Sequence, residues 1–207
     1  MSPDTPEPAG AGPREKPGAM AGKGDIGEVL PRIVELRDGH SVTVRMIHPD
    51  DKEALRAAFL RLSADARYTR FLAPLRQLSD QALESATHME PGRELALVAV
   101  TGDGASATIV GGARYAAAAT DGTCEFAITI ADEWQGRGLA RPLLTILLSA
   151  AAARGCRCME GYVLASNTPM RRLAARLGFA DERVPDEWSL RRVSLALDRG
   201  RRDAEPA

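Results

Sequence analysis

Two patterns of apolar residues alternate along the chain, and each predicts a different kind of element. Short apolar runs, or runs in which every second residue is apolar, are typical of strands; apolar residues that recur every three or four positions are typical of helices. Breaks rich in Gly, Asp and Pro separate these segments. The pattern predicts strands at residues 41–47, 94–101, 107–117, 123–131, 158–164, 179–183 and 189–197. It predicts helices at about residues 50–62, 79–88, 139–153 and 168–177.

Local signals mark the start of the first of these helices and the end of the last. Asp50 is expected to be the N-cap of the first helix, and Glu53, three residues later, would complete a capping box. Gly178 suits the position just beyond the last helix, because glycine adopts the left-handed conformation freely.

The order of the elements is β-α-α-β-β-β-α-β-α-β-β, which predicts a mixed sheet with helices packed on it. Gly102 to Gly104 and Asp121-Gly122 provide hairpin turns, so residues 94–131 are expected to form a three-stranded antiparallel meander. The helix at 139–153 is a crossover, so the strand at 158–164 should run parallel to the strand before it. The fold class is therefore α+β, or mixed α/β.

The two ends of the chain differ in composition from the middle. Residues 1–30 and 198–207 have few large apolar side chains, which predicts a disordered N-terminal tail and a flexible C-terminal tail around a domain at 41–197. No signal-peptide pattern is visible, and the longest apolar run, residues 142–153, is too short to span a bilayer. We therefore expect no membrane partner.

Charge and cysteine content narrow the function classes. The net charge is −1 and the pI is about 6.3, which argues against a large nucleic-acid interface despite local clusters of arginine. Three cysteines cannot form a complete disulfide framework, and their use fits a reducing cytoplasm. Cys156 and Cys158 have no second ligand pair and the three histidines are scattered, so no metal site is expected.

A glycine loop, Gln135-Gly136-Arg137-Gly138-Leu139-Ala140, lies between a predicted strand and a predicted helix. The first N–H groups of a helix have no internal partner, and the helix dipole places partial positive charge there. Two glycines let the backbone approach an anion closely. The loop therefore suits a pyrophosphate, although many ordinary strand–helix turns also contain glycine.

A second motif follows about one helix and one strand later. It reads Asn167-x-x-Met170-x-x-Leu173-x-x-x-Leu177-Gly178-Phe179. Together with Gln135-x-x-Gly138-x-Ala140, it resembles the GNAT acyltransferase superfamily over residues 41–197. That resemblance implies a central mixed, mostly antiparallel sheet with helices on both faces.

Three further segments, residues 44–51, 62–71 and 125–138, resemble the acetyltransferase domain of bacterial protein-lysine acetyltransferases. The larger proteins of that group carry an additional CoA-synthetase-like or nucleotide-sensing domain, for which 207 residues leave no room. The resemblance implies transfer of an acetyl group from acetyl-CoA to a primary amine, with a protein lysine preferred. A small amine acceptor, or an acyl-CoA-binding module with little turnover, remains open.

The resemblance also assigns donor-binding residues. The loop from Gln135 through Gly136, Arg137, Gly138 and Leu139 to Ala140 would hold the pyrophosphate, with Arg137 adding charge. Ile128 and Ile130 would offer backbone groups to the thioester and the pantetheine arm, with the Ile128 N–H polarising the carbonyl. The family separates this strand from the next parallel strand to form a V-shaped slot. An ordinary paired strand is the alternative.

The amine is expected to attack the thioester directly, so no cysteine nucleophile is needed. Glu125 is the candidate base, with partial burial expected to raise its pKa; a solvent-facing carboxylate is the alternative, and Glu133 is a weaker candidate. Asn167 would reach the pantetheine or the reacting centre, and it is also a good helix N-cap.

Relatives place a tyrosine acid seven residues after this asparagine, where the chain has Ala174. Tyr162 and Tyr115 remain as candidate acids, and a solvent proton is the alternative. Tyr68, Arg70 and Phe71 would line the acceptor side, or form a loop packed over the sheet. The two closing strands could pair across a homodimer.

Overall fold

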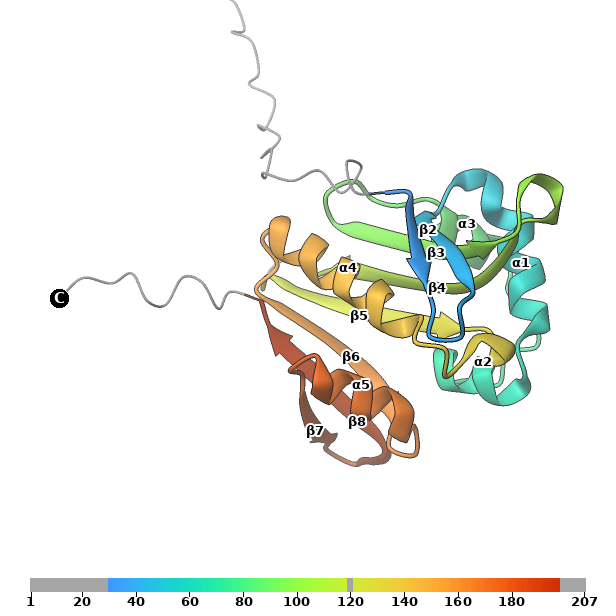
Figure 1. The fold of residues 1–207 in the computed structure, drawn as a ribbon. Helices are drawn as coiled ribbons and strands as arrows, with labels where there is room; N and C mark the ends of the chain where they lie inside the picture. The colour runs from blue at the N-terminus through green and yellow to red at the C-terminus, as the bar shows by residue number, and fades with distance from the viewer. Residues whose placement is uncertain (1–29, 119–120, 198–207) are drawn as a thin grey trace, which may run out of the picture.

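The computed structural model describes residues 30–118 and 121–197, so the predicted tails lie outside the described residues except for Leu30. Eight strands form one sheet in the order β1-β2-β3-β4-β5-β6-β8-β7 (Figure 1). The strands are β1 Arg32–Glu35, β2 Ser41–Met46, β3 Glu94–Thr101, β4 Thr108–Ala117, β5 Thr123–Ile130, β6 Cys158–Leu164, β7 Ala180–Val184 and β8 Glu187–Ala196. The helices are α1 Lys52–Arg61, α2 Ala64–Phe71, α3 Asp80–Thr87, α4 Ala140–Ala153 and α5 Thr168–Arg176.

The predicted topology is confirmed. β3, β4 and β5 form the antiparallel meander, and β5 pairs with β6 in parallel after the crossover through α4. The other pairings in the described sheet are antiparallel. The α+β fold with a mostly antiparallel sheet therefore stands. Within the described segments, no helix is long and apolar enough to cross a membrane.

Helices cover both faces of the sheet (Figure 1). The alternation of side chains along β3 shows which helices cover each face. Leu95, Leu97 and Ala99 point to the core beneath α4 and α5, where Leu143 and Leu147 of α4 are fully buried. Val98 and Val100 point to the opposite face, which α1 covers. β3 is thus buried on both sides, as its nearly uninterrupted apolar sequence requires.

Two elements were not predicted. β1 joins β2 through a turn at Arg37-Asp38-Gly39, in which Gly39 has a φ of 84°. The segment with Tyr68, Arg70 and Phe71, for which a loop packed over the sheet was one alternative, is the helix α2. Its N-cap Ser63 accepts a hydrogen bond from the Ala66 N–H at 3.1 Å. Asp132 holds Ser63 in turn, through the backbone N–H at 2.9 Å and the hydroxyl at 2.7 Å. This distant carboxylate fixes the start of α2, so the sequence around α2 carries only part of the signal.

The predicted capping box at Asp50 and Glu53 is wrong. A short 3₁₀ turn, Pro49–Asp51, precedes α1, and its N-cap is His48. Asp51 accepts the His48 N–H at 2.7 Å, and Arg45 donates two hydrogen bonds of 2.7 Å to the Asp51 carboxylate. His48 and Asp51 therefore form the capping box, and the ion pair with Arg45 holds Asp51 in its acidic position, two residues before the predicted Glu53.

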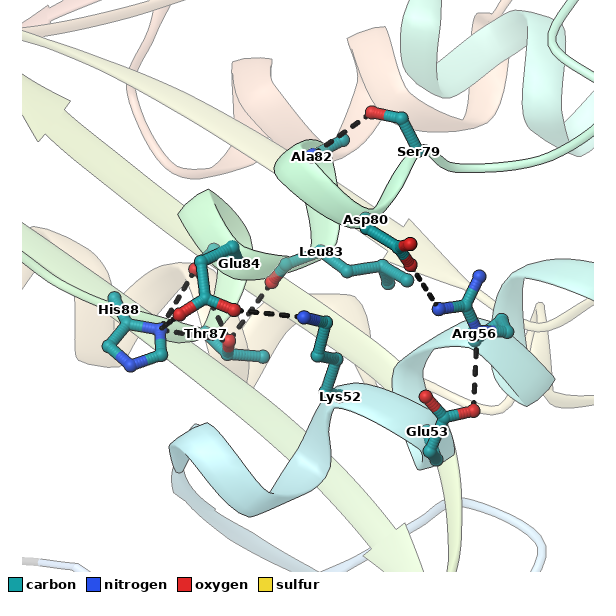
Figure 2. Close-up of polar contacts among 10 residues, drawn as sticks. All are labelled: Lys52, Glu53, Arg56, Ser79, Asp80, Ala82, Leu83, Glu84, Thr87 and His88. Atoms are coloured by element: carbon teal, nitrogen blue, oxygen red, sulfur yellow. Dashed lines mark hydrogen bonds and ion pairs between the residues drawn. The ribbon is translucent and has the colours of Figure 1, made fainter.

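Polar contacts join α1 to α3 above the sheet (Figure 2). Lys52 forms an ion pair with Glu84 at 2.9 Å, and Arg56 pairs with Asp80 at 2.6 Å. Leu83, between these acids in the sequence, is fully buried. Exposed pairs of this kind contribute little individually, so burial of apolar residues such as Leu83 is the main attachment of α3.

Candidate functional site

The pairing between β5 and β6 stops part-way along the strands. It runs from Thr123 opposite Cys158 to Glu125 opposite Glu160, and the remaining residues of both strands do not pair with each other. Phe126 and Gly161 are the next residues, and a Cβ on Gly161 would lie 2.7 Å from the Phe126 ring. The ring packs edge-on against Phe179, with centroids 5.5 Å apart. The predicted V-shaped slot is therefore present, with Phe126 at its apex.

A cavity of about 1040 Å³ opens where the strands separate. Its walls come from β5, the glycine loop, the first turn of α4, β6, α5 and α2. It is bordered by these predicted site residues: Glu125, Ile128, Ile130, Gln135, Gly136, Gly138, Leu139, Ala140 and Asn167. Arg137 is not on its wall. The fold thus gathers nearly all of the predicted donor residues around one space.

The backbone of β5 points alternate groups into this space. Ala131 donates its N–H to Val110 at 2.9 Å, and Thr123 accepts from Ala118 at 2.8 Å, so odd-numbered residues of β5 face β4. The N–H and C=O groups of Ile128 and the other even-numbered residues therefore face β6, beyond the end of its pairing. This is the direction that binding of a thioester or an amide-containing arm requires.

The glycine loop presents a helix N-terminus to the same cavity. Gly136 and Gly138 have φ angles of 75° and 97°, in the left-handed region that glycine adopts at low cost. In the described part of the chain, no side chain caps α4, so its first N–H groups stay available to an anion. The Gln135 amide donates to the Ile130 carbonyl at 3.2 Å and ties the loop to the end of β5. The residues fit the diphosphate and pantetheine parts of acetyl-CoA.

Asn167 is the N-cap of α5, because its side-chain oxygen accepts the Met170 N–H at 3.1 Å. The same half-buried side chain borders the cavity. The alternative structural role is thus confirmed, and contact with the pantetheine arm stays a prediction.

Glu125 is placed at the slot but not in the environment that the sequence predicted. It lies in the last β5–β6 pair, and its side chain is exposed instead of partly buried. Its cross-strand neighbours include Glu160, so two carboxylates lie at the point where the strands separate. The predicted partial burial of Glu125 is therefore wrong, and its exposure leaves the carboxylate open to an incoming ammonium group.

The two tyrosines that are candidate general acids lie in different environments. Tyr115 is fully buried in the core beneath α4, where burial raises the pKa of its hydroxyl, so it is not placed to protonate a leaving group. Tyr162 is 41% exposed and borders the cavity. Ala174 is buried in the core. Tyr162 is therefore the remaining tyrosine candidate of the two.

The cysteines do not offer a nucleophile at the slot. All three are free, and Cys124 is fully buried beneath α4. Burial, together with the neighbouring Cys156, raises the pKa of the Cys124 thiol far above neutrality. Within the described segments, no group of three or more potential ligands could hold a metal ion.

Arg70 and Phe71 border the cavity from α2, as does Tyr68, and their contact with the acceptor stays a prediction. A second, mostly apolar cavity of about 380 Å³ lies beneath α1, α2 and α3 and shares Arg70 and Phe71 with the first. Sequence reasoning missed this cavity and missed Arg37, Arg141 and Arg176 on the wall of the larger one. Arg141, directly after the loop motif on the first turn of α4, could have been found from its position.

Comparisons with known proteins agree with this geometry. The model of the acetyltransferase (GNAT) domain matches residues 41–180. The chain is 36% identical over 155 residues to an acetyltransferase of Pseudomonas aeruginosa, a match that covers 75% of this chain and 83% of that protein. It is 29% identical over 156 residues to Acetyltransferase Pat of Mycolicibacterium smegmatis, covering 72% of this chain but only 44% of Pat. The solved GNAT domain of S. lividans PAT superposes with a TM-score of 0.73 at 28% identity, covering 80% of this chain and 96% of that one.

A sheet divided at β5 and β6, with a glycine loop opening into α4, defines a GNAT-type acyltransferase. The family match and the P. aeruginosa relative make the assignment firm. The chain belongs to the GNAT acetyltransferase family, and it is an acetyl-CoA-dependent N-acyltransferase.

Proposed function

We propose that the acceptor is the side-chain amine of a protein lysine and that the transfer occurs by direct attack. The carrying observation is that the β5–β6 pairing ends at Glu125, whose exposed side chain lies beside the donor cavity. Tyr68 and Tyr162, 45% and 41% exposed, border the same cavity from α2 and β6. An open mouth of this kind suits a side chain presented by another folded protein. The resemblance of residues 44–51, 62–71 and 125–138 to bacterial protein-lysine acetyltransferases supports the same acceptor.

Glu125 takes one proton from the lysine ammonium, directly or through water, and leaves a free amine. The nitrogen lone pair then attacks the thioester carbonyl carbon, whose oxygen gains charge and is stabilised by the Ile128 N–H. The C–S bond breaks and the electron pair leaves on sulfur. The second nitrogen proton passes to the thiolate through Tyr162 or solvent, so the products are the amide and free CoA.

A small amine is the second candidate acceptor, and Arg70 favours it. Arg70 lies between the two cavities and stacks on the Phe71 ring at 4.8 Å. Across the described segments, no carboxylate lies within ion-pair distance of it. Burial, with Arg114 nearby, lowers the pKa of the Arg70 guanidinium; the Glu125 carboxylate opposes this shift, and the guanidinium stays charged at neutral pH. A small acceptor with an apolar body and a carboxylate would satisfy both the cavity and this charge.

The setting we propose is the cytoplasm, because three free cysteines fit a reducing compartment. Pairing of two copies would use β7, which lies at one edge of the sheet. Its Asp181, Glu182 and Arg183 are charged residues of the kind that protect an edge strand against pairing.

The acceptor is tested by incubating the pure enzyme with labelled acetyl-CoA and either a protein lysate or a panel of free amines. Acetylated lysines identified by mass spectrometry, absent with Glu125→Gln, support the first proposal. Label transferred only to carboxylate-bearing small amines, and lost with Arg70→Gln, supports the second. Acetyl-CoA binding with no transfer to either set contradicts both and favours a binding module.

A further inference from the structure

The β1–β2 turn packs directly on the glycine loop. Leu36 donates to the His40 carbonyl at 2.8 Å and closes a three-residue turn of Arg37, Asp38 and Gly39. The Arg37 N–H donates to the Arg137 carbonyl at 3.0 Å, which anchors the turn to the middle of the loop. Leu36 is buried in the core beneath α4. These residues lie just before the part of the chain that the family model matches, which begins at residue 41.

The turn engages the arginine that the loop itself supplies. The Arg137 guanidinium forms an ion pair with Asp38 at 2.9 Å and stacks on the Trp134 ring at 4.8 Å. His40 packs edge-on against the same Trp134 ring, with centroids 5.9 Å apart. Arg137 is thus held on the outer side of the loop, neutralised by Asp38 and away from the cavity wall. A phosphate in the cavity therefore needs its positive charge from elsewhere.

Arg37 has the placement that Arg137 lacks. Its side chain lies over Gly138, where a Cβ would be 3.3 Å from both Cγ and Nε of Arg37. It is exposed, it borders the donor cavity, and no described carboxylate lies within ion-pair distance of it. The absence of a side chain at Gly138 leaves room for both the arginine and a ligand above the loop.

We propose that Arg37 binds the diphosphate of acetyl-CoA and that the β1–β2 turn is part of the donor site. The guanidinium adds charge-assisted hydrogen bonds beside the loop N–H groups, an arrangement well suited to phosphate oxygens. The 3.0 Å backbone bond to Arg137 holds Arg37 in register with the loop, so the site is preorganised. Asp38 keeps Arg137 on the outer side of the loop, so Arg37 supplies the charge on the side of the cavity.

The test compares Arg37→Gln with Arg32→Gln, a matched change on the same hairpin at an exposed residue that does not border the cavity. Calorimetry measures the Kd for acetyl-CoA, for acetyl-dephospho-CoA and for S-acetylpantetheine, which has no phosphate. Arg37→Gln should weaken binding of the first two donors by on the order of tenfold or more and leave S-acetylpantetheine unchanged. Arg32→Gln should change none of them.

Equal weakening of all three donors, or no weakening of acetyl-CoA, would overturn the proposal, because Arg37 would then only pack on Gly138. If Arg37→Gln does not fold, Arg37→Lys keeps the charge and most of the packing; it should retain phosphate-dependent binding within a few-fold of wild type, and its loss would also overturn the proposal. The measurement needs no acceptor, so its outcome is independent of whether the acceptor is a lysine.

Discussion

Gly161 lies where β5 and β6 separate, and adding one methyl group there should perturb the slot at its apex. A Cβ on Gly161 would lie 2.7 Å from one carbon of the Phe126 ring and 3.0 Å from two more. Ordinary carbon contacts begin at 3.4 Å, so the ring would have to move by roughly half an ångström or more. Phe126 is 5% exposed and wedged against Phe179, which leaves the ring little freedom. Gly161 is not in the left-handed region, so this contact is the main cost.

Overpacking of a core costs about 1–3 kcal/mol, and Gly161→Ala should lower the free energy of unfolding by that amount. For a domain of this size the melting temperature should fall by about 2–4 °C per kcal/mol. The slot should change with it, so the Kd for acetyl-CoA should rise.

Urea unfolding and calorimetric titration measure the two effects of Gly161→Ala. Phe126→Leu, which removes part of the ring volume, should make the same change much less costly in the double variant. If a double-mutant cycle shows no coupling between Gly161 and Phe126, contact with the Phe126 ring is not the cause of the destabilisation.

Three further predictions concern residues around the site. Arg45 lowers the pKa of Asp51 by hydrogen bonding, so the stability that the Asp51 carboxylate contributes is full above its unfolded pKa of about 4 and is lost as the pH falls through the lower folded pKa. Urea unfolding at a series of pH values should show that Asp51→Asn loses less stability in acid than the wild type does, and parallel curves for the two proteins would count against this. Asn167→Ala should lose a cap worth about 1 kcal/mol, whereas Asn167→Ser should restore stability; if Asn167→Ser also keeps the wild-type KM for acetyl-CoA, Asn167 is a cap only. A Cys156→Ala, Cys158→Ala double variant should keep its turnover, and an acetyl-thioester adduct in the intact mass of the wild type would argue against direct attack.

Much of the fold follows from periodicity in the sequence. The bounds of β3 and β6 agree with the predicted strands, and α4 begins within one residue of the prediction, because apolar residues at regular spacing decide these elements locally. β1 was missed although Asp38-Gly39 between alternating apolar residues is a hairpin signal. α2 was missed because part of its cap depends on Asp132, far along the chain.

The site was predictable to the extent that it consists of backbone. The position of the loop beside the cavity follows from the motif. The slot was implied only by the family resemblance, with an ordinary paired strand as the alternative, and the observed ladder shows both the slot and the direction of the Ile128 N–H. Side-chain roles were less accessible, because they depend on contacts between distant segments. Arg137 belongs to the loop motif, yet it forms an ion pair with Asp38 of another hairpin, and Arg37 of that hairpin borders the cavity instead. Glu125 is exposed because its neighbours Cys124 and Phe126 point into the core beneath α4, so the Glu125 side chain points to the opposite face of the sheet.

The central claim is that a donor held in the slot is attacked by an amine that Glu125 deprotonates. It is tested most directly by measuring kcat/KM for acetyl transfer and the Kd for acetyl-CoA in wild type and Glu125→Gln. A general base contributes about 100-fold or more, so the account predicts a loss of that size in kcat/KM with the Kd unchanged. Turnover equal to wild type in Glu125→Gln would contradict it.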